Sequence, residues 1–199
     1  MTEDIYNATV IQRTELNPDL IILRVRSDSP LFHFQSGQYT VLGLTGERPR
    51  VAFSDTDDEQ SEPGRLIRRA YSISSSSKQR EYLEFYVSLI RSGSLPPRLF
   101  ALKTGHRVWL GPKATGQFTL SEVDDRHDLL LISTGTGLAP YISMIGSAHR
   151  CGEGRRFYVV HGARYSWDLG YRSELQALDY GCGTFTYLPT VTRADRDQT

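Results

Sequence analysis

The first 120 residues alternate apolar and polar positions over short segments, a pattern typical of β-strands with one buried face. Turn residues separate these segments, and Asn17-Pro18-Asp19 predicts an antiparallel hairpin between the first two. One short helix is expected at 98–102. The predicted strands lie at 9–16, 20–27, 38–44, 69–75, 82–90 and 107–110. Short strands joined by turns predict a closed antiparallel barrel or a sandwich.

The pattern changes after residue 123, where continuous apolar runs replace the alternation. The run Leu129-Leu130-Leu131-Ile132 predicts a strand that is buried on both faces, as in a parallel sheet. Strand and helix then alternate, which indicates a doubly wound unit. Strands are expected at 127–133, 157–161 and 184–189, and helices at 138–149 and 171–178. We therefore expect two domains, an antiparallel β-barrel at 1–123 followed by an α/β domain with a parallel sheet at 124–199.

Composition and charge narrow the classes of function. The chain carries 23 Lys and Arg against 23 Asp and Glu, so it lacks the basic excess of a nucleic-acid-binding protein. No apolar run approaches the roughly 18 residues of a membrane span, and the acidic N-terminus does not resemble a signal peptide. We therefore expect a cytoplasmic protein that binds neither membrane nor nucleic acid. Cys151 and Cys182 are expected to be free thiols, and no metal site is expected.

A glycine-rich turn, Ser133-Thr134-Gly135-Thr136-Gly137, follows the first strand of the second domain. Glycine removes the Cβ atoms that would keep a diphosphate away, and the N–H groups of the next helix favour negative charge there. Pro140 suits the first helical turn, because its missing N–H is not needed at that position. The segment therefore predicts a dinucleotide site. The alternative is a tight strand-to-helix turn without a ligand.

A second candidate site is Arg69-Ala70-Tyr71-Ser72, at the start of a barrel strand. A guanidinium offers a rigid fork for phosphate, and a tyrosine ring offers a face for stacking. A serine hydroxyl can donate a hydrogen bond to a ring nitrogen. The alternative is that Tyr71 and Ile73 only alternate along a barrel wall.

Both segments belong to a longer series of motifs. In chain order, the series is Gly37-Gln38-Tyr39, Arg69-Ala70-Tyr71-Ser72, Leu83-Glu84-Phe85-Tyr86-Val87-Ser88, Gly93-Ser94-Leu95-Pro96-Pro97-Arg98-Leu99, Thr134-Gly135-Thr136-Gly137-Leu138-Ala139-Pro140 and Val160-His161-Gly162-Ala163-Arg164-Tyr165. The series covers nearly the whole chain and closely resembles the bacterial ferredoxin/flavodoxin-NADP+ reductases. Several motifs in one order are far more specific than any one of them.

The resemblance implies that the barrel binds FAD. Arg69 would contact the diphosphate, Tyr71 would cover one face of the isoalloxazine ring, and Ser72 would reach its N5 atom. Further contacts are implied for Ala70, Tyr86, Val87, Ser88, Leu89, Ser94, Leu95 and Pro96. Relatives usually have a serine or threonine in place of Pro96. A hydroxyl and an N–H donor are therefore absent, and we expect either weaker FAD binding or a phosphate held by neighbouring groups.

The resemblance also implies an NADP(H) site in the second domain. Thr136 would lie near both flavin and nicotinamide, while Ala163-Arg164 and Thr192-Arg193 would recognise the 2′-phosphate of NADP(H). The alternative for both arginines is an ordinary surface position. The implied activity is electron transfer between NADP(H) and ferredoxin or flavodoxin through FAD, with no side chain acting as acid or nucleophile. One hypothesis places a docking face for the acidic carrier on Arg91, Arg98, Lys103, Arg107 and Lys113.

The chain also departs from the family. Relatives continue beyond the third parallel strand, so we expect an NADP(H) domain that is incomplete, or truncated, at its C-terminal end. The alternative function is therefore a flavin-binding module or fragment without NADPH turnover. The acidic segment 54–64 is expected to be a solvated loop. We expect a structural role for His161, and packing roles for Trp109 and Trp167.

Overall fold

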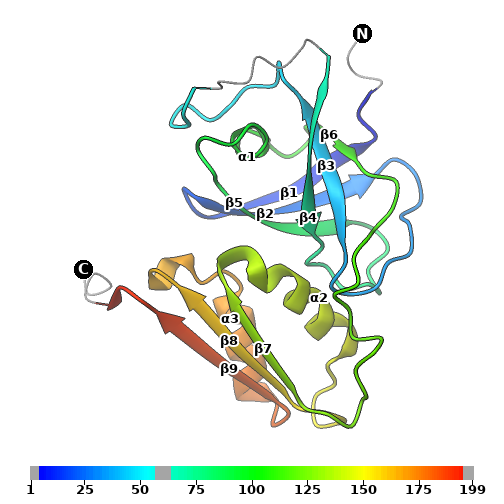
Figure 1. Cartoon of the computed structure of the whole chain (residues 1–199), viewed down its shortest axis with the longest axis vertical. Helices are drawn as coiled ribbons and strands as arrows, with labels where there is room; N and C mark the ends of the chain where they lie inside the picture. The colour runs from blue at the N-terminus through cyan, green and yellow to red at the C-terminus, as the bar shows by residue number, and fades with distance from the viewer. Residues whose placement is uncertain (1–4, 57–63, 195–199) are drawn as a thin grey trace.

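The structure is a computed structural model that describes residues 5–56 and 64–194. Figure 1 shows two units, with the N-terminal unit above and the C-terminal unit below, and the chain passes from one to the other once. Most of the predicted acidic loop at 54–64 lies outside the described residues. The proposed domain boundary at residues 123 and 124 falls in the segment that joins the two units.

The N-terminal unit is an antiparallel barrel, as predicted. Its elements are β1 (Ala8–Asn17), β2 (Leu20–Ser27), β3 (Tyr39–Thr45), β4 (Leu66–Ser72), β5 (Leu83–Ser88), α1 (Pro96–Phe100) and β6 (Arg107–Leu110). The order across the sheet is β4-β3-β6-β1-β2-β5, and a bridge between Ile73 and Phe85 joins the two outer strands and closes the barrel. The predicted hairpin forms, and the Asn17 side chain accepts the N–H of Asp19 at 2.9 Å.

Apolar side chains that alternate with polar ones along the strands fill the interior of the barrel. Ile21, Leu23 and Val25 of β2 are fully buried, and Arg24 and Arg26 alternate with them on the outer side. Helix α1 is buried along its whole length and begins two residues earlier than predicted, because proline suits the first turn of a helix. Strand β4 begins three residues earlier than predicted, because pairing with β3 extends through its exposed arginines.

The C-terminal unit is a parallel sheet with helices, also as predicted. Its elements are β7 (Leu129–Thr134), the 3-10 helix η2 (Gly135–Leu138), α2 (Ala139–Ala148), β8 (Phe157–Ala163), the 3-10 helix η3 (Ser166–Asp168), α3 (Arg172–Gly181) and β9 (Phe185–Val191). The strands follow one another in the order β7-β8-β9 and are parallel. No helix in the described part of the chain is long and apolar enough to cross a membrane.

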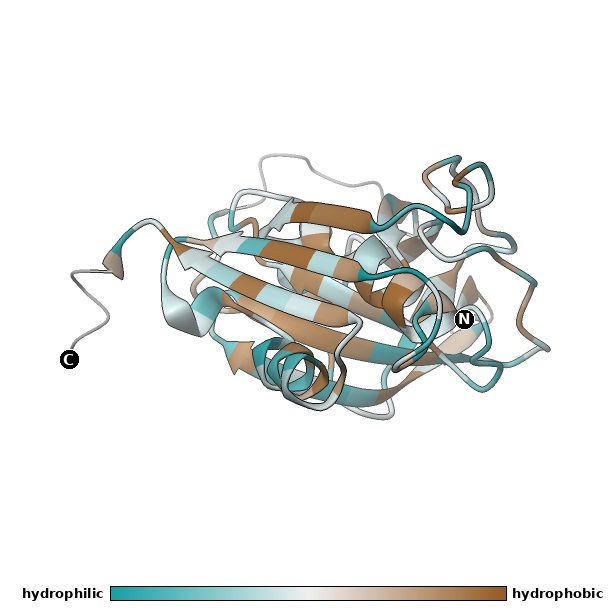
Figure 2. Ribbon diagram, turned by 90° about the horizontal axis from the view of Figure 1, so that it is seen from below, coloured by the Kyte–Doolittle hydropathy of each residue, from teal (hydrophilic) through white to brown (hydrophobic). Residues whose placement is uncertain are grey.

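Burial on both faces of β7 was predicted wrongly. Leu129 and Leu131 are buried with α2 and α3 in one apolar cluster, whereas Leu130 and Ile132 are each 62% exposed. Successive right-handed crossovers that step in the same direction place their helices on the same face of a sheet. Figure 2 shows the apolar and polar residues that alternate along the strands. The opposite face of this sheet is therefore open within the described residues.

The two cysteines were also predicted wrongly. Cys151, after α2, and Cys182, after α3, form a disulfide across a sequence separation of 31 residues. The prediction of free thiols used the rarity of disulfides in the cytosol and took no account of chain geometry. Helices α2 and α3 both end beside the amino ends of the parallel strands. The residues that follow them, Cys151 and Cys182, therefore come to a Cα–Cα distance of 5.2 Å.

A polar interface joins the two units. The Tyr171 hydroxyl donates to Glu84 Oε1 at 2.9 Å, and Arg24 Nε donates to Glu84 Oε2 at 2.7 Å. The Tyr86 hydroxyl accepts the N–H of Gly170 at 3.1 Å, and the rings of Tyr86 and Tyr171 meet edge to face with centroids 5.2 Å apart. Tyr171 has a φ of +60°, the one positive value among the described residues other than glycine. This interface holds the buried Tyr171 in a costly backbone conformation.

Candidate functional site

A cleft of about 500 Å³ lies beside the barrel, and we name it the barrel cleft. It is lined by Arg69, Ala70, Tyr71, Ser72, Tyr86, Val87, Ser88, Ile90, Gly93, Ser94, Pro96, Thr136, Gly137 and Ala139. Most of these residues come from β4, β5 and the turn before α1. The cleft therefore brings together three of the barrel motifs that lie apart in the sequence.

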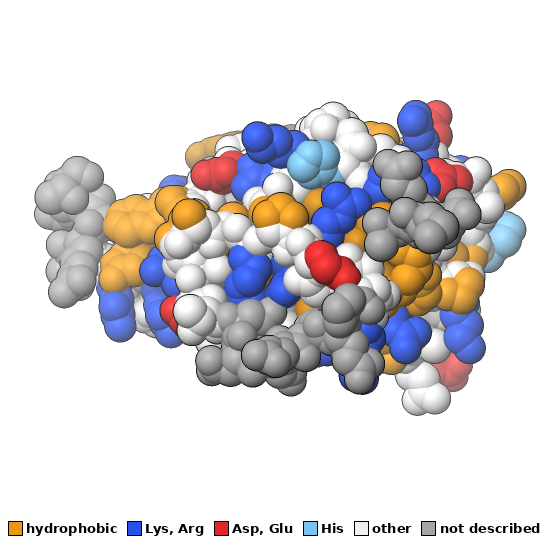
Figure 3. Space-filling model, turned by 90° about the horizontal axis from the view of Figure 1, so that it is seen from above, with side chains coloured by type: hydrophobic (Ala, Val, Ile, Leu, Met, Phe, Trp, Pro, Cys, Tyr) orange, Lys and Arg blue, Asp and Glu red, His pale blue; other side chains and the backbone are white. Residues whose placement is uncertain are grey.

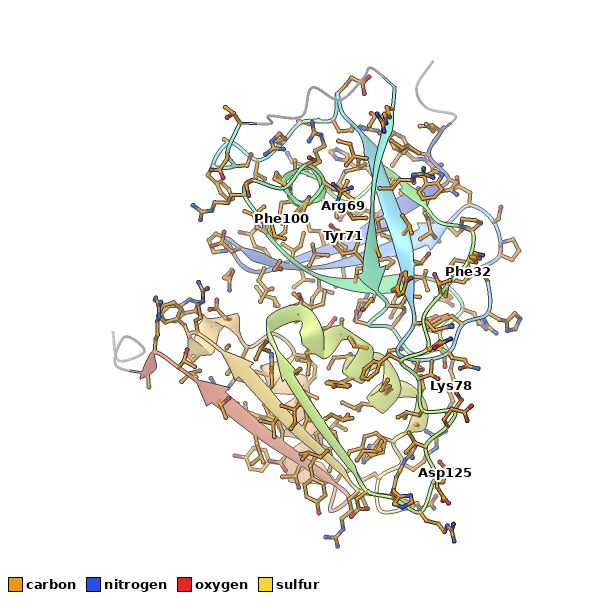
Figure 4. The ribbon with its side chains drawn as sticks, viewed as in Figure 1. Phe32, Arg69, Tyr71, Lys78, Phe100 and Asp125 are labelled. Carbon is orange, nitrogen blue, oxygen red and sulfur yellow. A yellow bond between two sulfur atoms is a disulfide. The ribbon has the colours of Figure 1, made fainter. Side chains whose placement is uncertain are left out.

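Strand β4 supplies the charged and aromatic groups of the barrel cleft. Arg69 and Tyr71 are two residues apart and so lie on the same side of the strand (Figure 4). Burial raises the pKa of Tyr71, so the ring is uncharged at neutral pH. Arg69 is exposed, and its guanidinium donates to the carbonyl oxygen of Arg68 at 2.9 Å. The cleft thus offers a cation beside a neutral ring.

The turn before α1 is fixed by a buried arginine. Arg98 is 4% exposed, and its guanidinium donates to the carbonyl oxygens of Ser94 and Gly46, the latter at 2.6 Å from Nη2. Ser94 and Pro96 reach the barrel cleft, whereas the side chain of Leu95 is fully buried in the barrel core and lines neither cleft. Arg98 therefore shapes the turn and is not a surface residue.

A second cleft, of about 1000 Å³, lies at the carboxyl ends of the parallel strands, and we name it the strand-end cleft. It is lined by Asn17, Pro18, Asp19, Leu20, Ser88, Leu89, Arg91, Thr134, Gly135, Thr136, Gly162, Ala163, Arg164, Tyr165, Trp167, Asp168, Thr190 and Thr192. In open α/β sheets, ligands bind outside the carboxyl ends of the strands. Gly135 has a φ of +51°, a conformation that other residues rarely adopt, and this accounts for glycine in the turn.

The two clefts share part of their walls. Thr136, in η2, and Ser88, at the end of β5, line both of them. A ligand in one cleft would therefore approach a ligand in the other at Thr136. Sequence reasoning placed Thr136 at this junction, but it missed the β1–β2 hairpin, whose turn also lines the strand-end cleft. No sequence signal links that hairpin to a site more than 100 residues away.

The predicted arginines lie at neighbouring strand ends. The backbone N–H of Arg193 donates to the carbonyl oxygen of Arg164 at 3.0 Å. Arg164 lines the strand-end cleft. Arg193 is not among its lining residues, and its guanidinium donates to the Tyr165 hydroxyl at 3.0 Å. Two cations therefore lie beside one mouth of the cleft.

His161 lies beneath the glycine turn. It is fully buried, and its Nδ1 is 3.2 Å from the Tyr187 hydroxyl. Burial lowers the pKa of His161, opposed by the hydrogen-bonding effect of the Gly135 backbone as an acceptor from the ring, and burial raises the pKa of Tyr187 to about 12. His161 is therefore neutral at pH 7 and adds no charge to the turn, which agrees with the structural role expected for it.

The predicted basic docking face does not form as a single patch. Arg98 is buried, and Arg107 is bound by Asp28 in a two-bond ion pair that lowers the pKa of the Asp28 carboxyl. Figure 3 shows Lys and Arg side chains spread over the barrel end of the molecule with acidic side chains among them. Within the described residues, no group of His, Cys, Asp and Glu is arranged to hold a metal ion.

Comparison with known proteins agrees with this architecture. A family model described as an oxidoreductase NAD-binding domain matches residues 131–199. Over 151 residues the chain is 35% identical to the flavodoxin/ferredoxin–NADP reductase of Shigella flexneri, which corresponds to 76% of this chain and 54% of that protein. Over 173 residues it is 31% identical to the ferredoxin–NADP reductase of Azotobacter vinelandii. That match covers 83% of this chain and 60% of that protein.

Solved structures show the same fold. A ferredoxin NADP+ reductase from Neisseria gonorrhoeae, solved with bound FAD and NADP, superposes with a TM-score of 0.77 at 23% identity. The superposition covers 94% of this chain and 68% of that one. A ferredoxin-NADP+ reductase from Plasmodium falciparum, solved with 2′P-AMP, gives a TM-score of 0.74 at 16% identity. This superposition covers 97% of this chain and 76% of that one.

The barrel, the parallel unit and the matched segment give this chain the architecture of proteins that join a β-barrel to a domain of the oxidoreductase NAD-binding family. Within that class, the chain is a relative of the bacterial flavodoxin/ferredoxin–NADP reductases. It spans little more than half the length of the curated relatives it matches.

Proposed function

We propose that the chain is the part of a flavodoxin/ferredoxin–NADP reductase that binds FAD in the barrel cleft and NADP(H) in the strand-end cleft. The observation that carries this proposal is the shared wall at Thr136 and Ser88, because electron transfer between two cofactors requires their reactive rings to meet. When bound, FAD supplies the chemistry: it takes up a hydride from NADPH and releases electrons singly.

The residues of the barrel cleft fit FAD. A cleft of about 500 Å³ is within the size range of cofactor sites. Arg69 offers a guanidinium to the diphosphate, Tyr71 offers a neutral ring face to the isoalloxazine, and Ser72 offers a hydroxyl to its N5. Pro96 occupies the helical turn where relatives carry a hydroxyl, so the diphosphate relies on the remaining donors.

The strand-end cleft fits an NADP(H) molecule. The turn at Gly135 exposes backbone N–H groups to a diphosphate without a side chain in the way. Arg164 and Arg193 provide two guanidiniums for a dianionic 2′-phosphate, which favours NADP(H) over NAD(H). Thr136 lies at the end of the cleft that adjoins the barrel, where the nicotinamide belongs.

The open sheet face favours a second candidate function. Leu130 and Ile132 are more exposed than apolar residues of a parallel sheet usually are. A module of these described residues that holds FAD but positions NADPH poorly would fit that observation.

We further propose ferredoxin or flavodoxin as the electron carrier and the cytoplasm as the location, where the Cys151–Cys182 disulfide would be an exception to the usual reduced state of thiols. The names of the relatives support the carrier. We retain 1–123 as the FAD-binding domain and 124–199 as the incomplete NADP(H)-binding domain, since the six-stranded sheet of the described residues lies in the first range and the three-stranded sheet in the second.

One experiment tests the proposed function and separates the two candidates. The purified chain is loaded with FAD, freed of excess cofactor, and titrated with NADPH without oxygen while the flavin absorption band is followed. Bleaching of the band is expected for the reductase. A stable yellow protein that never bleaches supports the flavin-binding module, and a protein that takes up no FAD contradicts both.

Arg69→Ala tests the diphosphate contact. A hydrogen bond to a charged group contributes about 1.5 to 3 kcal/mol, so FAD should bind roughly ten to one hundred times more weakly. Arg68→Ala is the matched control, because it removes the neighbouring exposed guanidinium, which does not line the barrel cleft. Equal FAD affinity in the two variants contradicts the role of Arg69.

A further inference from the structure

Trp167 is an exposed aromatic residue at the wall of the strand-end cleft. It lies in η3, immediately after the second parallel strand and its loop, and is 50% exposed. The packing role expected from the sequence is therefore incomplete, because half of the residue contributes nothing to a core. A large apolar ring that stays exposed beside a cleft is typical of a binding surface.

The ring of Trp167 is held flat against Tyr165. Their centroids are 4.6 Å apart and their planes differ by 10°, so the two rings are stacked. The guanidinium carbon of Arg193 lies 5.7 Å from the centroid of the Tyr165 ring, and an Arg193 nitrogen donates to its hydroxyl. Tyr165 is therefore engaged by two neighbours, and Trp167, which lines the cleft with it, is the more exposed of the two stacked rings.

The backbone of η3 is anchored to the barrel. The side-chain amide of Asn17 donates to the carbonyl oxygen of Trp167 at 3.1 Å and to Asp168 Oδ1 at 3.0 Å. The N–H of Leu169 closes the turn on the carbonyl oxygen of Ser166. The position of the indole is thus set before any ligand arrives, which lowers the entropic cost of binding against it.

The surrounding charges define what can bind on this ring. Arg164 and Arg193 lie at the adjacent strand ends, so the ligand combines a flat aromatic ring with phosphate. The proposed function, on which this inference rests, assigns the nicotinamide end of NADP(H) to Thr136. The other flat ring of the same molecule is adenine. We propose that the adenine ring of NADP(H) stacks on Trp167, which makes Trp167 a ligand-binding residue of the strand-end cleft.

Intrinsic fluorescence can test this stacking, because the chain has 2 tryptophans. Trp109→Phe leaves Trp167 as the single indole. The FAD-free Trp109→Phe protein is titrated with 2′,5′-ADP, which carries the adenine and the 2′-phosphate but no nicotinamide. Quenching of Trp167 fluorescence is expected, with the same dissociation constant as calorimetry on the unsubstituted chain. Nicotinamide mononucleotide, which lacks adenine, should leave the fluorescence unchanged.

Affinity gives an independent measure. A base stacked on an aromatic side chain is stabilised enough that Trp167→Ala should weaken 2′,5′-ADP binding roughly 5- to 150-fold. Trp167→Phe should recover most of the affinity, because a ring is kept. Tyr180→Ala is the control, since Tyr180 is 90% exposed but lines neither cleft, and it should bind as the unsubstituted chain does.

The possible outcomes separate this inference from the proposed function. If calorimetry detects 2′,5′-ADP binding but Trp167 fluorescence and Trp167→Ala affinity are unchanged, stacking is wrong and the NADP(H) site stands. Quenching by nicotinamide mononucleotide alone would reverse the orientation and overturn the inference. If calorimetry detects no binding of 2′,5′-ADP to the chain, the NADP(H) site itself fails, and the stacking fails with it.

Discussion

Tyr171→Phe removes one hydroxyl from the interface between the two units and leaves the ring in place. That hydroxyl donates to Glu84 Oε1 at 2.9 Å, while Arg24 occupies the other carboxylate oxygen. Glu84 is 7% exposed, so water cannot readily replace the lost donor. A hydrogen bond to a charged group contributes about 1.5 to 3 kcal/mol, and we expect a destabilisation of about 2 kcal/mol. The ring contact with Tyr86 should remain.

Urea denaturation followed by circular dichroism measures this loss. With a slope of about 2 kcal/mol per molar urea, the midpoint should fall by about 1 M. Tyr180→Phe is the matched control, because it removes a hydroxyl from α3, the helix that follows Tyr171, at a residue that is 90% exposed, and its midpoint should not move. Equal midpoints for the two variants would refute the argument that the Tyr171 hydroxyl stabilises the interface.

Three further predictions concern stability. Gly170→Ala should destabilise the chain by about 1 to 3 kcal/mol, because the new Cβ would lie 2.3 Å from the hydroxyl oxygen of Tyr86. Gly183→Ala is the control and should be tolerated, because its new Cβ meets nothing within 4 Å. The urea midpoints of the two variants give the comparison. Burial lowers the pKa of His161, so the imidazole binds a proton more tightly in the unfolded chain than in the folded one. The free energy of unfolding should therefore fall as the pH drops below about 6.5. The fall should be shallower in His161→Gln, and an unchanged slope would contradict a lowered pKa for His161. Cys182→Ala opens a disulfide loop with a sequence separation of 31 residues and should cost about 3 to 4 kcal/mol by loop entropy, and a thermal midpoint equal to that of the unsubstituted chain would argue against the bond.

Local patterns were sufficient to predict most of the elements. The alternation in β2 gives its buried face directly, because neighbouring side chains point to opposite sides of a strand. The glycine-rich turn after β7 was also predicted, on the ground that glycine keeps Cβ atoms away from a diphosphate, and the structure adds that Gly135 has a φ of +51° that is costly for other residues. Arg69 and Tyr71 were predicted as site residues from the chemistry of their side chains and from the family resemblance, and the structure places both on one side of β4. Their ligand roles remain predictions.

Features that depend on distant parts of the chain were not predictable. Tyr171 and Glu84 are 87 residues apart, and no local sequence pattern around either residue predicts their contact. The continuous apolar run of β7 indicated two buried faces, but coverage depends on where both helices cross, and they cross on one side. Trp167 was assigned to packing because hydrophobicity does not reveal whether a ring faces the core or a cleft.

The interface at Tyr171 also limits how this chain can be recombined. A chimaera that joins its barrel to the parallel-sheet unit of a related protein would separate Glu84 from the hydroxyl of Tyr171. Any residue other than glycine that the swap brings to position 170 would also collide with Tyr86. Swaps that carry the 168–171 segment together with its own β5 should therefore fold, while swaps with a crossover between them should give poorly expressed protein even when both halves are sound. For hybrids of this chain with its relatives, the unit of exchange is this pair of segments and not the domain.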